Sequence, residues 1–148
     1  MKLTIELVPS TSWGSNLRSA LSTKDWDTLR KECYAKSNHV CEICGGKGRK
    51  HPVEAHEVWS YDDSQHIQTL VRLIALCPSC HECKHIGRAL SVGNGPQAVQ
   101  HFAKVNSLTL KEAELRVLGE LELWKQRSQH PWTLDLTWLD SYGIKRKS

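Results

Sequence analysis

The sequence predicts an α+β fold in a single domain spanning residues 1–148, with a zinc-stabilised core between about residues 41 and 90. Two Cys-x-x-Cys pairs bracket that core, and this spacing lets two thiolates of one turn reach a single tetrahedral Zn²⁺. Stretches in which every second residue is apolar predict strands, and stretches with apolar residues three or four apart predict helices. Residues 1–40 are expected to add a strand and a helix, and residues 91–148 further helices and a strand.

The composition is that of an ordinary globular protein, with 39% apolar and 24% charged residues. A formal net charge of +4 permits a nucleic-acid partner without requiring one. No run of about 18 apolar residues is present, so no membrane association is expected. The N-terminal stretch carries Glu6 and is too short in apolar residues for a signal peptide. Six cysteines without an export signal then indicate a reducing compartment, which predicts the cytoplasm.

The N-terminal elements follow from periodicity. Leu3, Ile5 and Leu7 alternate with polar residues, which predicts a strand with one buried face. A helix is expected from Thr23, whose hydroxyl can cap it, and Cys33 falls near its apolar face. We therefore interpret Cys33 as a small buried apolar residue and not as a metal ligand.

The two cysteine pairs are Cys41 with Cys44 and Cys77 with Cys80. Cys83 forms an overlapping Cys-x-x-Cys with Cys80, so spacing alone leaves it as an alternative to Cys77. A glycine-rich turn follows the first pair and carries three basic residues that we expect to be exposed. Either these residues contact the phosphates of a nucleic acid or they form a solvated basic turn. They are Lys47, Arg49 and Lys50.

Residues 53–61 and 67–76 have the pattern of two strands joined by a polar loop, which predicts a hairpin. Pro78 is suited to the first turn of a helix, which we expect to continue to about Leu90. The hairpin and the helix would both be tied to the zinc site, because the second cysteine pair lies at their junction.

Three histidines are candidates for a second metal site. His81 and His85 are four residues apart on the predicted helix and therefore share a face. His56 lies in the first strand of the hairpin, and three imidazoles from a strand and a helix can hold a divalent ion with open positions. The alternative is that all three are solvated surface residues. Arg88 lies one turn beyond His85 and is a candidate nucleic-acid contact.

The C-terminal part is predicted to contain a helix from Pro96 and a longer helix with a capping box at Thr109. Residues 132–138 alternate between apolar and polar, which predicts a second terminal strand. We expect the two terminal strands to pair. The basic residues 145–147 are expected to form a solvated end.

The order of these motifs resembles that of the HNH endonucleases, which have the ββα-metal fold. The resemblance covers about residues 41–88: a first Cys-x-x-Cys, the segment VEAHEVW, and then LCPSCH followed by a further histidine. It implies a metal-dependent endonuclease or nickase that hydrolyses DNA phosphodiester bonds in a bacterium or a phage-infected host cell. It also implies a structural zinc ion and one catalytic divalent metal such as Mg²⁺, Mn²⁺ or Zn²⁺. The implied zinc ligands are Cys41, Cys44, Cys77 and Cys80, and the implied catalytic-metal ligands are His56, His81 and His85.

Two positions depart from the family pattern. Glu57 stands where the family has the histidine that activates water, and Arg72 stands where it has the middle asparagine. Glu57 would then be the base, and Arg72 would pair with a phosphate oxygen or lie at a strand edge on the surface. If the alignment is shifted by one residue, His56 becomes the base and Ala55 occupies a ligand position.

Three functional classes remain open at this point. The first is the nuclease, with nucleic acid, and above all DNA, as its partner. The second is a catalytically impaired, zinc-stabilised module that binds nucleic acid or a protein partner, which the departures at Glu57 and Arg72 favour. The third is covalent c-type haem attachment, because residues 77–81 also match the Cys-x-x-Cys-His pattern.

Overall fold

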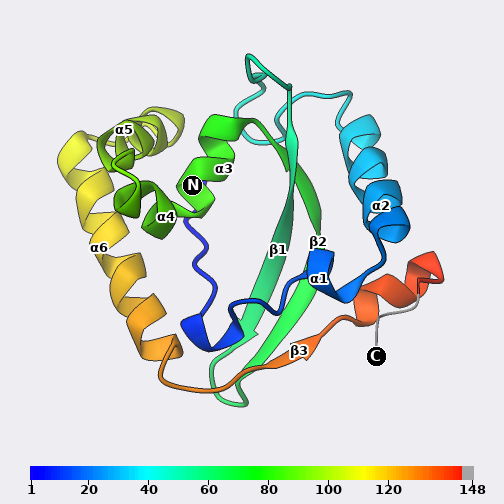
Figure 1. The fold of residues 1–148 in the computed structure, drawn as a ribbon. Helices are drawn as coiled ribbons and strands as arrows, with labels where there is room; N and C mark the ends of the chain where they lie inside the picture. The colour runs from blue at the N-terminus through cyan, green and yellow to red at the C-terminus, as the bar shows by residue number, and fades with distance from the viewer. Residues whose placement is uncertain (145–148) are drawn as a thin grey trace.

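A twisted β-hairpin lies at the centre of the structure, which is a computed structural model and describes residues 1–144 (Figure 1). Strand β1 (Glu54–Asp62) pairs antiparallel with β2 (Ile67–Leu76), with a register shift between Val58 and Trp59. The short strand β3 (Thr133–Asp135) pairs parallel with the beginning of β2, which gives the strand order β1-β2-β3. The predicted α+β class and the hairpin are therefore confirmed.

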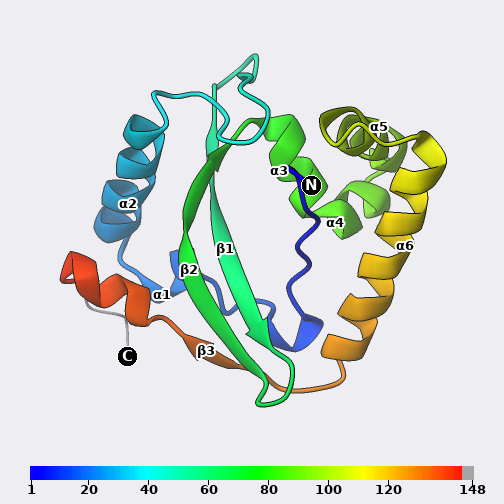
Figure 2. The same ribbon diagram turned by 180° about the vertical axis from the view of Figure 1, so that it is seen from behind.

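Helices cover both sides of this sheet, as the view from behind also shows (Figure 2). On one side lie α3 (Pro78–Lys84), α4 (Ile86–Ser91), α5 (Gly95–Val105) and α6 (Leu110–Arg127). On the other side lie α1 (Leu17–Ala20), α2 (Thr23–Lys36) and the 3-10 helix η2 (Thr137–Tyr142). A second 3-10 helix, η1 (Ser10–Ser12), follows the N-terminal segment. None of the helices in the described residues is long and apolar enough to cross a membrane.

Each side of the sheet has its own apolar core, because successive residues of a strand point to opposite faces. Leu76 belongs to the core with α3 to α6, where Phe102 is 2% exposed. Leu70 and Trp59 belong to the core with α1, α2 and η2, where Trp26 is 8% exposed. Cys33 is buried in this second core, as predicted.

Most helix boundaries agree with the sequence, and the differences have local causes. The capping box at Thr109 is present, whereas α2 is capped by Ser22, whose hydroxyl accepts from Asp25 N, and not by Thr23. The helix predicted to reach about Leu90 is broken into α3 and α4 at His85, whose backbone leaves the helical region with φ −109° and ψ 50°.

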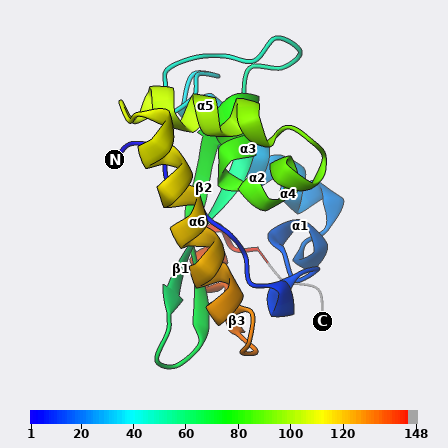
Figure 3. The ribbon, with the colours of Figure 1, turned by 90° about the vertical axis from the view of Figure 1, so that its left-hand side faces the viewer.

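The predictions of an N-terminal strand and of its pairing with the C-terminal strand were wrong. Residues 2–8 form no regular secondary structure and are not part of the sheet, although Leu3 and Ile5 are buried. It runs between the hairpin and α6, where Figure 3 shows it passing behind that helix. The side-chain amide of Asn106 bonds both backbone groups of Leu3, at 2.9 and 2.8 Å, and Glu6 N donates to Lys84 O. Residues at the ends of α5 and α3 thus supply the hydrogen bonds that a neighbouring strand would otherwise make.

The C-terminal strand is shorter than predicted. Of residues 132–138, only β3 is a strand, and it pairs with β2 instead of the N-terminal segment. The carboxylate of Asp135 accepts hydrogen bonds from both the backbone and the hydroxyl of Thr137, which turns the chain into η2. The basic residues 145–147 lie outside the described part of the chain.

Candidate metal centres

The four cysteines of the predicted zinc site meet where the loop after α2 approaches the beginning of α3. Their sulfur atoms all lie within 4.8 Å of one another, and Cys44 Sγ is 3.6 Å from Cys77 Sγ. Sulfurs bound tetrahedrally to one zinc at ~2.3 Å are about 3.8 Å apart, so the cluster has the dimensions of such a site. Gly48 N donates to Pro52 O and so holds the loop in place, and a Cβ on Gly48 would lie 2.3 Å from His51 O and 2.7 Å from the ring of Pro78. These four cysteines can hold a metal such as zinc.

The thiols of Cys41 and Cys77 differ in their tendency to ionise when no cation is bound. A hydrogen bond from Cys80 lowers the pKa of Cys41 to about 4, whereas burial raises the pKa of Cys77 to about 11. A divalent ion is the group that allows all four sulfurs to be thiolates together. Cys83 lies outside the cluster: it is buried, and its thiol donates to Ala98 O at 3.2 Å, so it is not the fourth ligand.

His101, on α5, also contacts the cysteine cluster. Its Nε2 lies 3.2 Å from Cys80 Sγ, a distance at which a ring N–H can donate to a thiolate. The sequence analysis missed this residue. Only the helical periodicity of α5 could have indicated it, because that periodicity places His101 beside the apolar stripe.

The three predicted histidines form a second cluster on the side of the sheet that faces α3. One ring nitrogen from each of His56, His81 and His85 lies within 4.8 Å of the others. The Nε2 atoms of His81 and His85 are 3.2 Å apart. Nitrogens bound tetrahedrally to one ion at ~2.0–2.1 Å are about 3.3 Å apart, so this pair has ligand spacing. The break after α3 places His85 where its ring meets His81.

A carboxylate lies next to each of two rings. Glu54 Oε1 is 2.9 Å from Nδ1 of His81, and since an ionised carboxylate only accepts, Nδ1 carries the proton. The lone pair of His81 is then on Nε2, which faces His85. Glu6 Oε2 is 3.4 Å from Nε2 of His56, which is buried and is not aligned for a hydrogen bond. A carboxylate beside one ring nitrogen favours the proton there and leaves the other nitrogen free to bind a cation.

Glu6 is itself held by a buried lysine. Lys84, at the end of α3, is 4% exposed, and its Nζ lies 2.5 Å from Glu6 Oε2 and 2.8 Å from Thr4 Oγ1. Burial alone would raise the pKa of Glu6, but the contacts with His56 and Lys84 outweigh it and the pKa is lowered. Glu6 is therefore an anion beside the histidine cluster at neutral pH.

His56 and His85 are uncharged at neutral pH. Burial, with the neighbouring His81 and His56, lowers the pKa of His85 to about 4. Burial also lowers the pKa of His56, and the carboxylate of Glu6 opposes this only in part. Neutral imidazole is the form that binds a metal ion, so both rings are in the ligating state.

Glu57 does not reach this cluster, which corrects its prediction as the base of the site. It follows His56 in a strand, so its side chain points to the opposite face of the sheet. There its Oε1 accepts a hydrogen bond of 3.1 Å from the backbone of Leu17, at the beginning of α1. Burial raises the pKa of Glu57 above its ordinary value.

Arg72 does not reach the histidines either, so its prediction as a catalytic residue is also corrected. Beyond β3, one edge of β2 has no neighbouring strand among residues 1–144, and Arg72 lies along this edge. Its Nη2 is 2.7 Å from Glu42 Oε1, and its Nε donates to Leu73 O. Glu42 in turn exchanges hydrogen bonds with both backbone groups of Ala75. The two residues close this edge of the sheet.

The predicted nucleic-acid contacts are all exposed, namely Lys47, Arg49, Lys50 and Arg88. The basic turn is linked to the histidine cluster through His51, whose Nε2 is 2.9 Å from Glu54 Oε2. Glu54 thus bridges His51 and His81 with its two oxygens. Arg88 N donates to His85 O, so the backbone of Arg88 lies directly beside the cluster.

Comparisons of the chain with models of known protein families, with curated proteins and with solved structures gave no match. Any functional conclusion must therefore come from the two metal-ligand clusters and the side chains around them.

Proposed function

We propose that the chain is a metal-dependent endonuclease or nickase of the HNH type that hydrolyses DNA phosphodiester bonds. The observation that carries this proposal is the convergence of His56, His81 and His85. One imidazole comes from the first strand of a hairpin, one from the helix α3 that follows it and one from the break directly after α3, beside a four-cysteine cluster. This is the arrangement expected of a ββα-metal core that holds a structural zinc ion and a separate divalent ion.

The residues of the chain have distinct roles in this proposal. His56, His81 and His85 would hold the catalytic divalent ion, Glu54 would fix the ring of His81, and Glu6 the ring of His56. An ion bound there polarises a scissile phosphate and stabilises the charge on the leaving oxygen. The exposed Arg88 and the basic turn at 47–50 would contact flanking phosphates, which would fix the strand without reading its sequence.

A second function is favoured by a separate observation. Glu57 and Arg72, the residues at the positions of the family's base and middle asparagine, are both used elsewhere in the fold. A chain in which neither position serves the metal site fits a zinc-stabilised module that binds nucleic acid or a protein without cleaving it.

Nicking of supercoiled plasmid separates the two functions. Purified protein is incubated with plasmid and Mg²⁺, Mn²⁺ or Zn²⁺, or with EDTA, beside His81→Ala and the control His130→Ala. His130 is exposed and lies outside both clusters, so its loss should leave cleavage intact. Metal-dependent cleavage lost only in His81→Ala supports the nuclease. Failure to cleave plasmid, single strands or RNA, with the structural zinc retained, would support the binding module.

A further inference from the structure

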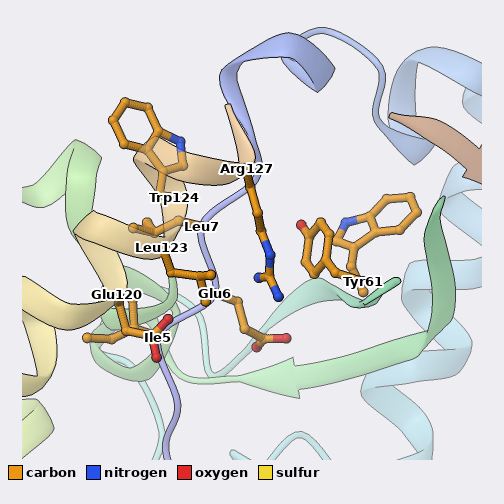
Figure 4. Close-up of a pocket in the computed structure, with 9 residues that line it drawn as sticks. Ile5, Glu6, Leu7, Tyr61, Glu120, Leu123, Trp124 and Arg127 are labelled. Atoms are coloured by element: carbon orange, nitrogen blue, oxygen red, sulfur yellow. The ribbon is translucent and has the colours of Figure 1, made fainter. Parts of the chain in front are cut away.

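A cavity of about 320 Å³ opens between the N-terminal segment, β1 and the last turns of α6 (Figure 4). Its walls include three aromatic side chains, Trp59 and Tyr61 from β1 and Trp124 from α6. Its polar groups are Glu6, Glu120 and the guanidinium of Arg127, which Figure 4 shows pointing toward Tyr61 and Glu6. The volume is that of a site for a small organic group.

The aromatic walls are held in place by contacts outside the cavity. The indole N–H of Trp124 donates to Val8 O, and its ring stacks with Trp13 at 6.1 Å between centroids. The ring of Tyr61 meets the edge of Trp132 at 5.4 Å and has the guanidinium of Arg127 at 4.4 Å. Flat surfaces that are already fixed lose little entropy when a planar ligand stacks on them.

The charges around the cavity decide the class of ligand. The charge of Glu6 is matched by Lys84, whereas the carboxylate of Glu120 would repel a phosphate inside the cavity. The charge of the Arg127 guanidinium is matched by Asp63, which it meets at 2.9 and 3.0 Å, so Arg127 adds no net charge to the cavity. Within residues 1–144, the carboxylate of Glu120 has no hydrogen-bond or ion-pair partner. The aromatic walls and the acceptor Glu120 therefore suit a planar ligand that has N–H groups at its edge and brings no phosphate into the cavity.

The cavity adjoins the histidine cluster, because Glu6 belongs to both. The same carboxylate that lines the cavity lies 3.4 Å from His56 Nε2. We propose that this cavity binds a nucleobase of the strand whose phosphate enters the histidine site, with Glu120 accepting an N–H of the base. This inference rests on the proposed function for the identity of the substrate, and it adds that the base beside the cleaved bond is unstacked. A single strand supplies such a base directly, whereas a duplex must flip it out.

The test uses uncharged deoxynucleosides, which lack the phosphate that the histidine site or the basic turn would attract. Deoxyadenosine, deoxycytidine, deoxyguanosine and thymidine are titrated into ¹⁵N-labelled full-length protein while the indole N–H signals are followed by NMR. Glu120→Gln is compared with Glu122→Gln, a matched change on the same helix at an exposed residue that does not line the cavity.

We expect the indole signals of Trp59 and Trp124 to shift on titration, and Glu120→Gln to weaken binding about tenfold while Glu122→Gln does not. The inference is overturned if no deoxynucleoside moves these signals, or if Glu120→Gln binds as well as Glu122→Gln. Binding by a protein that never cleaves DNA would overturn the proposed function while supporting the cavity as a base site. DNA cleavage by a protein that binds no deoxynucleoside would support the proposed function and overturn the cavity as a base site.

Discussion

The free edge of β2 offers a quantitative test of where Arg72 acts. Removing Glu42 with Glu42→Ala deletes a charged acceptor 2.7 Å from Ala75 N, and such a hydrogen bond contributes about 1.5–3 kcal/mol. It also deletes the ion pair with Arg72, whose side chain is 49% exposed, which adds at most about 1 kcal/mol. We therefore expect Glu42→Ala to lower the free energy of unfolding by about 2–3 kcal/mol. Arg72→Ala leaves the bond to Ala75 intact and should cost about 1 kcal/mol.

Thermal unfolding, followed by circular dichroism at constant zinc concentration, measures these differences. An unfolding entropy of ~2.1 cal/mol/K per residue makes 1 kcal/mol equivalent to about 3 °C for a chain of 148 residues. Tm should fall by about 6–9 °C for Glu42→Ala and about 3 °C for Arg72→Ala. The double variant should show a coupling free energy of about 0.5–1 kcal/mol. An Arg72→Ala protein of unchanged Tm that has lost DNA cleavage would refute the reasoning, because it would assign Arg72 to the active site.

Three further predictions concern the metal centres and the opposite face of the sheet. Cys44→Ser should abolish zinc binding at the cysteine cluster and lower Tm, whereas Cys33→Ala should keep one zinc per chain by elemental analysis, since Cys33 lies outside the cluster. Glu54→Gln should weaken binding of the second divalent ion about 10–100-fold by calorimetry, and Glu57→Gln should leave it unchanged. Burial raises the pKa of Glu57 in the folded state, so its contribution to stability is present below the unfolded pKa and is lost as pH rises through the folded pKa. Urea unfolding between pH 4 and 8 should therefore show Glu57→Gln gaining stability relative to the native chain as pH rises, and a constant difference would contradict this sign.

The parts of the site that could be predicted are those in which sequence spacing fixes the geometry. Cys-x-x-Cys leaves little freedom in where two sulfurs meet, and residues four apart on a helix must share a face. For that reason the cysteine cluster follows directly from the sequence, and the last turn of α3, in which His85 N donates to His81 O, still brings these two histidines together. The same rule of alternation applies to His56 and Glu57, which are neighbours in a strand and cannot both face α3. Their separation was therefore predictable, and alignment to a family motif concealed it.

The N-terminal strand illustrates a different limit. An extended segment exposes alternate residues to opposite sides whether or not its backbone pairs with another strand. Burial of Leu3 and Ile5 therefore satisfies the alternating pattern equally well beside helices, with Asn106 as the backbone partner. Periodicity reports burial, and it does not identify the hydrogen-bond partner.

Glu6 could not be assigned to the histidine site from the sequence. Its position depends on the N-terminal segment, which pairs with no strand, and no local sequence pattern connects it to His56. The segment is tied to α3 by Lys84, whose buried ammonium group meets both Glu6 and Thr4. Removing the segment would leave Lys84 as a buried cation without partners, which is far more costly than losing an exposed ion pair. The cost of leaving Lys84 unpaired thus keeps the carboxylate of Glu6 beside His56. A histidine site built within residues 41–88 therefore depends on a residue that lies well outside that range.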